Sequence, residues 1–165
     1  MAHASGQFED LIGDYFNGSN SSAFSTNFSG NSYSISDLSS VNSEWSSGNV
    51  KLALATNTAG SLGARFSSFT EASGTDYARV SDDANSSGYL AMVAGSTNGE
   101  WENQYDISFA QAGSGGWGAI TYAIFCFDDG TDDFPLIACP LASTTTVGAN
   151  TTLTFSAGDL KYTVA

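Results

Sequence analysis

The sequence predicts a single domain that is mostly β: a β-sandwich of jelly-roll or Greek-key type, with a short N-terminal amphipathic helix and an extended polar arm. From residue 50 onward, short apolar stretches alternate with turns rich in Gly, Asn, Asp and Ser, which is typical of all-β domains. Hydrophobic residues make up 41% and aromatic residues 13% of the 165 residues, enough for a sizeable core. Charged residues make up 13%, about half the usual share.

The strongest strand pattern lies in the segment Trp117–Leu141. The stretch Ala119–Phe127 is apolar on both alternating faces, so it must be covered on both sides and belongs in the middle of a sheet. Phe134–Leu141 has the same pattern and returns after a loop with four aspartates. Pro135 and Pro140 cannot donate ladder hydrogen bonds, so we expect them at strand ends or at an edge.

Other parts of the domain carry shorter strand patterns. The stretch Val50–Thr56 alternates as a half-buried strand does, and Gly60–Phe69 is ambiguous, with one helical turn as an interpretation. The remaining predicted strands are separated by turn signals: Asp76–Ser81, Tyr89–Ala94, Gln104–Phe109, Thr144–Val147, Thr151–Phe155 and Leu160–Val164.

Residues 1–18 are predicted to contain the helix. Its large apolar residues recur at helical spacing, and Ser5 and Gly18 suit its two ends. These apolar residues are Phe8, Leu11, Ile12, Tyr15 and Phe16. Such a helix packs either on its own sandwich or on a neighbouring subunit.

Residues 19–49 form a polar segment rich in Ser, Asn and Gly, followed by the sandwich domain of residues 50–165. A free linker would not need large apolar side chains at intervals, so we expect an arm that these side chains pin down. The arm lies either on its own domain or on a partner. The side chains concerned are Phe24, Phe28, Tyr33, Ile35, Leu38, Val41 and Trp45.

The charge is strongly acidic, with 17 acidic and 4 basic residues and a net charge of -13. Such a chain repels phosphate backbones and anionic lipid surfaces, so neither a nucleic acid nor a membrane is an expected partner. The N-terminus also lacks the basic and apolar regions of a signal peptide.

The two cysteines are expected to be free and buried. With the aspartate loop centred near Gly130, Cys126 faces the neighbourhood of Pro135, and Cys139 faces that of Tyr122. The thiols then lie on one face, about 13 Å apart along the strands, too far for a disulfide. A register slip would bring them together and stays an alternative. Free thiols suit assembly in a reducing cytoplasm.

Catalytic motifs are missing from the sequence. The only histidine, His3, lies near a terminus that we expect to be frayed, so a Ser-His-Asp triad or a zinc site is not predicted. Phosphate-binding and dinucleotide motifs are absent as well. We therefore expect a protein that is not an enzyme and has no cofactor and no metal.

Two acidic groups are candidate sites. The loop with Asp128, Asp129, Asp132 and Asp133 is interpreted either as a calcium site or as a solvated turn that discourages edge pairing. The segment Glu100–Glu102, with Trp101 between its two acids, is interpreted as a surface loop, a glycan-binding platform or, least well supported, a glycosidase acid pair.

The order of the motifs resembles a family of small virion proteins of tailed bacteriophages, described as tail-fibre-like or as capsid decoration proteins. The resemblance covers residues 8–18 and about 50–165, while residues 19–49 and 84–102 are longer than the family pattern. Each motif is weak alone, and seven in order carry the resemblance. They are FEDLIGDYF, VKLALAT, TDYARV, YDISFAQA, GGWGAITYAIFCFDDG, PLIACPLASTTTVGAN and LTFSAGDLKYTV.

The resemblance implies a structural role in the virion and brings no catalytic residues. We expect a capsid decoration (cement) protein, a homotrimer on the outer capsid surface, assembled in the host cytoplasm. It would bind the major capsid protein and stabilise the head by bridging capsomers. The alternatives are a tail, baseplate or fibre component, or a glycan-binding host-adhesion module. The residues expected at the partner interface are Phe8, Tyr15, Phe16, Phe24, Phe28, Tyr33 and Trp45.

Overall fold

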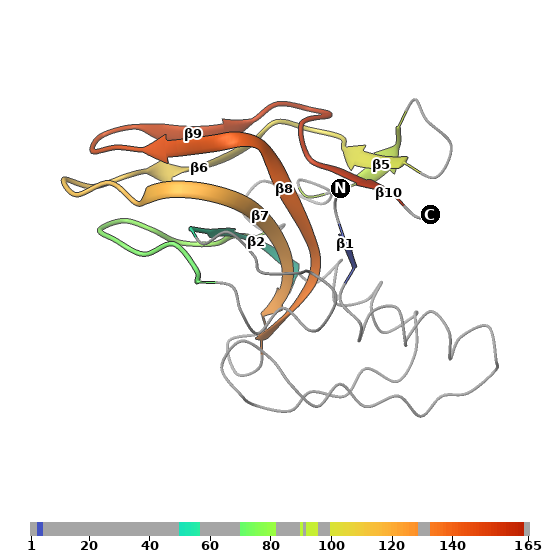
Figure 1. The fold of residues 1–165 in the computed structure, drawn as a ribbon, viewed down its shortest axis with the longest axis horizontal. Coiled ribbons are helices and arrows are strands. Elements are labelled where there is room, and N and C mark those ends of the chain that lie inside the picture. The colour runs from blue at the N-terminus through green and yellow to red at the C-terminus, as the bar shows by residue number, and fades with distance from the viewer. Residues whose placement is uncertain are drawn as a thin grey trace.

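The computed structural model describes residues 3–4, 50–56, 70–81, 90, 92–95, 100–128 and 133–163. Within these residues the chain forms ten strands and no helix, which confirms the mostly β prediction (Figure 1). The strands are β1 (His3–Ala4), β2 (Val50–Ala55), β3 (Val80–Ser81), β4 (Met92–Ala94), β5 (Glu100–Asn103), β6 (Ile107–Gln111), β7 (Gly118–Asp128), β8 (Asp133–Val147), β9 (Thr152–Phe155) and β10 (Lys161–Thr163).

The strands form three antiparallel sheets, with the orders β1-β8-β7-β2-β3, β10-β5-β4 and β6-β9. The pairing is nested along the chain: β7 pairs with β8, β6 with β9 around them, and β5 with β10 around those. The predicted N-terminal helix and the polar arm of residues 19–49 lie outside the described residues. Their predictions therefore stay predictions.

The strand β7 lies between β8 and β2, as its two apolar faces predict. Its ladder with β2 runs without a register shift from Val50, opposite Phe127, to Ala55, opposite Tyr122. Because successive side chains of a strand point to opposite sides, β7 divides its residues between two apolar layers. Phe125 faces the main core, and Ile124 faces a smaller one.

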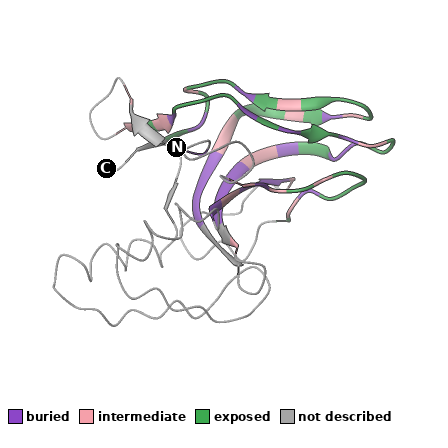
Figure 2. Ribbon diagram, turned by 180° about the vertical axis from the view of Figure 1, so that it is seen from behind, coloured by how far each residue is buried: buried purple, intermediate pink, exposed green. Residues whose placement is uncertain are grey.

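The main core joins side chains of the five-stranded sheet to side chains of the sheet β6-β9. In Figure 2 the buried positions run along the inner stretches of the long curved strands. Trp117 lies in this core, where its Nε1 donates a hydrogen bond to the Thr75 carbonyl at 3.2 Å. Its ring meets those of Tyr77 and Phe109 edge-on, and Phe109 meets Phe155 in the same way. These edge-to-face pairs fix the relative positions of β6, β9 and the segments just before β3 and β7.

The prolines of β8 lie beside breaks in the ladder. Phe125 pairs with Ile137 whereas Cys126 pairs with Pro135, so β8 carries one extra residue there. A larger shift follows Pro140, because the ladder resumes only at Thr145. A residue at a bulge does not need to donate a ladder hydrogen bond, so proline is tolerated. Pro140 therefore lies inside β8 and not at a strand end. The expected edge position holds, because among the described residues β8 is an edge strand from Cys139 onward, where β1 no longer pairs with it.

Several element boundaries differ from the sequence predictions. Thr144–Val147 is the end of β8 and not a separate strand. The stretch assigned to a surface loop around Trp101 is β5, held between β10 and β4. β10 is distant in sequence, so no local pattern reveals that pairing, whereas only residues 95–99 separate β4 from β5. The predicted strands Asp76–Ser81 and Tyr89–Ala94 shorten to β3 and β4, and Gly60–Phe69 lies outside the described residues.

The N-terminus enters the sheet. His3 and Ala4 form β1, which pairs with Ala138 and Ile137 of β8. This corrects the expectation that His3 lies at a frayed end, because backbone pairing holds the segment against the sheet edge.

Candidate functional site

The aromatic residues predicted to contact a partner fall outside the described residues. Their role as an interface therefore stays a prediction. They are Phe8, Tyr15, Phe16, Phe24, Phe28, Tyr33 and Trp45.

A cluster of charged side chains, here called the Arg79 cluster, joins β2, the segment before β3 and the end of β7; its members are Lys51, Glu71, Tyr77, Arg79 and Asp128. Arg79 Nε and Nη2 donate to the two carboxylate oxygens of Glu71 at 2.8 and 2.6 Å. Its Nη1 donates to Asp128 Oδ2 at 2.9 Å, and Lys51 Nζ lies 3.2 Å from that same oxygen. The Arg79 side chain is 13% exposed. Such a forked, largely buried contact fixes geometry better than a surface ion pair does.

Tyr77 links this cluster to the sheet. Its hydroxyl donates to Glu71 Oε1 at 3.0 Å and accepts a hydrogen bond from the Leu54 backbone N–H at 3.0 Å. Burial and then the charge of Glu71 raise the pKa of Tyr77 above its ordinary value. The hydroxyl therefore keeps its proton and serves as a structural donor, because both of its contacts are made within the fold.

Asp128 is the member of the aspartate loop whose contacts the structure describes. It accepts from Arg79 and pairs with Lys51, so it is not the solvated turn residue that one interpretation expected. A cation at this carboxylate would have to compete with two positive side chains. No group of three or more metal-ligating side chains occurs among the described residues. Asp129 and Asp132 lie outside them, so the calcium hypothesis stays a prediction.

Glu100 and Glu102 share a cation on the opposite strand. Lys161 of β10 pairs with Glu102 in the ladder, and its Nζ lies 3.0 Å from Glu100 Oε1 and 3.1 Å from Glu102 Oε2. Hydrogen bonds to the two carboxylates raise the pKa of Lys161. A lysine between them is unlike the opposed carboxyl pair of a glycosidase, so the acids act as a cross-strand clamp.

Two aromatic side chains stand out on the surface near this clamp. Trp101 is 45% exposed and Tyr105 is 48% exposed, and they are the exposed large hydrophobic side chains in the described part of the chain. Strand alternation directs Trp101 to the side opposite Glu100 and Glu102. A flat exposed ring suits stacking against a sugar or a partner protein.

Asn103 is a buried polar residue that the sequence analysis missed. Its Nδ2 donates to the carbonyls of Tyr105 and Ser156 at 2.8 and 2.9 Å, and its Oδ1 accepts from the Leu160 N–H at 2.8 Å. Its own backbone carbonyl accepts from Gly158. Asn103 therefore holds β5 against the turn between β9 and β10, which places the adjacent Trp101 and Tyr105.

Both cysteines are free and buried, as expected. Cys126 faces Pro135, and Cys139 faces Ala123, the residue next to Tyr122. Cys139 lies in the main core, whereas Cys126 follows the parity of Ile124, so the thiols lie on opposite faces and not on one. Burial raises the pKa of Cys139 to about 12, which leaves this thiol unreactive at neutral pH.

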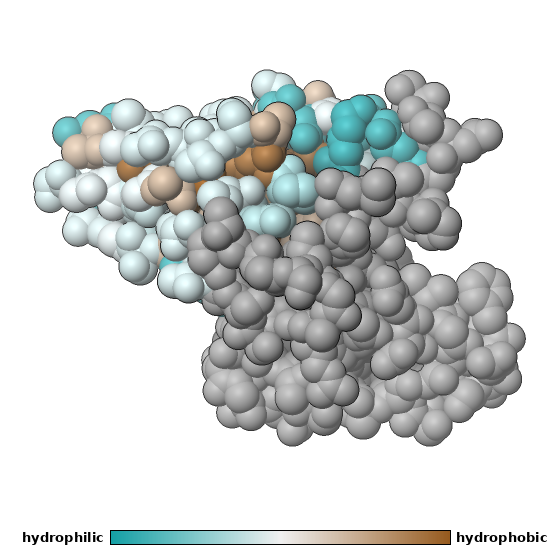
Figure 3. All heavy atoms as spheres, viewed as in Figure 1, coloured by the Kyte–Doolittle hydropathy of each residue, from teal (hydrophilic) through white to brown (hydrophobic). Residues whose placement is uncertain are grey.

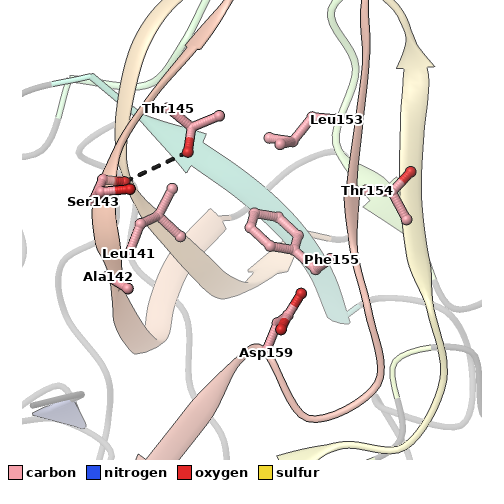
Figure 4. Close-up of a pocket in the computed structure, with 8 residues that line it drawn as sticks. All are labelled: Leu141, Ala142, Ser143, Thr145, Leu153, Thr154, Phe155 and Asp159. Atoms are coloured by element: carbon pink, nitrogen blue, oxygen red, sulfur yellow. Dashed lines mark hydrogen bonds between the residues drawn. The ribbon is translucent and has the colours of Figure 1, made fainter.

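A groove of about 340 Å³, here called the β8–β9 groove, opens between β8 and the β9–β10 region (Figure 4). Leu141, Leu153 and Phe155 form its apolar part, and all three also pack with the main core. Its polar part is mostly hydroxyl groups, with one carboxylate at Asp159. The remaining lining residues are Ala142, Ser143, Thr145 and Thr154. Sequence reasoning missed the groove because its two walls belong to different sheets.

Within the described part of the chain, the ion pairs join charged side chains of neighbouring strands and segments to one another. The Arg79 cluster and the Lys161 clamp hold strands together, and neither presents a nucleophile beside a base. The described residues also contain no helix with the length and apolar character of a membrane span.

The comparisons with known proteins agree with the resemblance drawn from the motifs. The family model of the podophage GP4 fiber I protein gp80 matches residues 21–163, which is well over half of the chain. A search of curated proteins found no match. The matched range includes all of the described strands except β1. The chain therefore belongs to the podophage GP4 fiber I protein gp80 family, a family of structural proteins of the phage virion.

Proposed function

We propose that this protein is a non-enzymatic component of a tail fibre in a tailed bacteriophage virion. The observation that carries the proposal is the family match over residues 21–163, because the description of that family names a fibre. The mostly β fold supports it, since a rigid sheet scaffold tied by the Arg79 cluster and Asn103 suits a load-bearing part. The net charge of -13 is consistent with a surface that does not bind DNA.

We further infer that the three sheets form a β-sandwich of jelly-roll type. The nested pairing of β7–β8, β6–β9 and β5–β10 supports this, as does a main core shared between the five-stranded sheet and the sheet β6-β9. In this arrangement the loops at the two ends of the sandwich are the natural places for contacts with other virion proteins.

Capsid decoration, with the protein bridging capsomers on the outer head surface as a homotrimer, has less support than the fibre role. The family description names a fibre and not the head. The two proposals place the protein at different parts of the particle, so an image of the virion separates them.

The test is labelling of purified virions with gold-conjugated antibodies raised against the isolated protein. Label on the tail apparatus supports the fibre role, and label spread over the head replaces it with decoration. Virions treated with pre-immune antibody are the control. Particles that carry no specific label, although the antibody binds the isolated protein on a blot of the same virions, would place the epitopes inside the particle and contradict both.

A second candidate function, recognition of a host glycan, is favoured by the exposure of Trp101 and Tyr105. Aromatic rings stack on the apolar faces of sugars, and Asn103 holds these two rings beside a fixed turn. The test is binding of the isolated protein to a glycan array, with Trp101→Ala and Tyr105→Ala compared with Ser114→Ala, an exposed residue in another turn. Binding that both aromatic variants lose and the control keeps supports this role, and a silent array removes it.

A further inference from the structure

The stretch from Phe134 to Gly158 contains no charged residue, in a chain with 17 acids and 4 bases. It includes nearly all of β8, all of β9 and most of the lining of the β8–β9 groove. In Figure 3 the hydrophilic colour gathers over β5 and β10, while a brown patch lies near the bend of β8 and the surface around it is pale. Acidic repulsion is therefore weak at this part of the described surface.

The outer edge of β8 is open along this uncharged stretch. β1 pairs with β8 only at Ile137 and Ala138. Beyond that point no strand pairs with the outer edge of β8 among the described residues, and residues 141–144 also have no partner in the β7 ladder. Soluble proteins usually protect such edges with charges or prolines, or cover them. Residues 141–147 contain neither a charge nor a proline.

The open edge and the groove adjoin each other. Leu141, Ala142, Ser143 and Thr145 of β8 line the groove, and Figure 4 shows the side chains of Leu141, Leu153 and Phe155 gathered around it. An extended segment that adds to a strand edge directs alternate side chains to one side. One of them can therefore enter the groove while the backbone pairs with β8.

We propose that this edge and the β8–β9 groove together form a self-association surface, occupied by a second copy of this chain. Two chains with a net charge of -13 repel each other, and this repulsion is smallest where neither chain presents charge. The second copy carries the same uncharged edge, whereas an unrelated basic partner would be drawn to the acidic surfaces elsewhere. The proposal is argued from the edge and the groove and does not depend on whether the protein belongs to the fibre or the head.

The test measures self-association of the isolated full-length chain by sedimentation velocity over a range of protein concentrations. Thr144 and Thr146 are exposed on the open edge, and Ser114 is exposed in the turn between β6 and β7. The variants are Thr144→Lys/Thr146→Lys and Thr144→Glu/Thr146→Glu, with Ser114→Lys and Ser114→Glu as controls. A separate variant, Ser143→Trp, fills the groove without adding charge. Circular dichroism checks that each variant is folded.

The wild-type chain is expected to self-associate, and more tightly as salt rises from about 0.05 to about 0.5 M, because salt screens the repulsion. Both charged pairs should raise the dissociation constant by at least about tenfold, since each leaves charges without partners in the contact. Ser143→Trp should weaken association as well, and the Ser114 controls should stay within about twofold of wild type.

The opposite signs of the two charged pairs separate a local contact from a general charge effect. If only overall repulsion governs association, the lysine pair strengthens it and the glutamate pair weakens it, and the proposed surface is wrong. A chain that stays monomeric at every concentration and salt also overturns the proposal. Either result leaves the virion-labelling test of the fibre role untouched, because that test detects where the protein lies and not how it associates.

Discussion

Replacing Arg79 with alanine should destabilise the domain substantially, because this guanidinium satisfies Glu71 and Asp128 at once. Removing one partner of a fully buried ion pair costs about 3–5 kcal/mol, whereas an exposed pair contributes about 1 kcal/mol or less. The Arg79 side chain is 13% exposed, and those of Asp128 and Glu71 are 19% and 28% exposed. The contact lies between these limits, so we expect a loss of about 2–3 kcal/mol in the free energy of unfolding.

For a chain of this length that loss corresponds to a fall of about 5–10 °C in Tm. The assay is thermal and urea unfolding followed by far-ultraviolet circular dichroism and tryptophan fluorescence. Arg79→Lys keeps the charge but not the planar fork, so its Tm should fall between those of wild type and Arg79→Ala. Lys161→Ala is the matched control. Lys161 also has two carboxylate partners, but its side chain is 47% exposed. Equal Tm values for Arg79→Ala and Lys161→Ala would refute the reasoning.

Three further predictions concern buried groups. Asn103→Ala should lower the free energy of unfolding by about 2–3 kcal/mol, because the Leu160 N–H and two carbonyls lose their partner. Urea unfolding measures this loss. A change below about 0.5 kcal/mol contradicts the role given to Asn103. Both cysteines should resist a thiol reagent in the native state and react in urea. The Cys139 pKa is raised from 9.0 to about 12, so above about pH 9 the thiol loses its proton in the unfolded chain before it does so in the folded one, and the free energy of unfolding should fall. Cys139→Val should make this fall shallower. Identical pH profiles of stability for wild type and Cys139→Val would contradict the prediction. Gly116→Ala should destabilise the domain more than Gly118→Ala does. Both glycines have positive φ, but only at Gly116 would a Cβ collide with the Val147 carbonyl. Unfolding curves in which Gly118→Ala is the less stable variant would contradict this.

The sequence predicted the parts of the fold that depend on local pattern. The double-sided apolar run that became β7 needs two covered faces, and the alternation over Val50–Thr56 predicted the strand β2. Both follow from the period of two in a strand, so they could be found without the structure. β2 is, however, buried on both faces except at Lys51, and not half-buried as expected. The free state of Cys126 and Cys139 followed from their distance along the strands, although the face of Cys139 did not, because one bulge in β8 reverses the parity.

The candidate sites depended much less on local pattern. The stretch around Trp101 was interpreted as a surface loop, yet its pairing with β4 and with the distant strand β10 makes it β5. Asp128 looked like a solvated turn residue until Arg79, far away in sequence, was found beside it. In each case a long-range partner changed the environment of a residue whose neighbours in sequence gave no sign of it.

The sequence by itself determined that the chain is mostly β and strongly acidic, since composition and strand period are local properties. It also showed that the motifs follow the same order as in the virion proteins that the chain resembles. Only the tertiary structure decided which charged side chains form ion pairs and which strand edge lacks a pairing strand among the described residues. It brought Arg79 to two carboxylates and Lys161 between two glutamates, and it left the uncharged edge of β8 beside a groove. These outcomes depend on strand order and register, which bring residues distant in sequence within hydrogen-bonding or packing distance, and no local pattern encodes them.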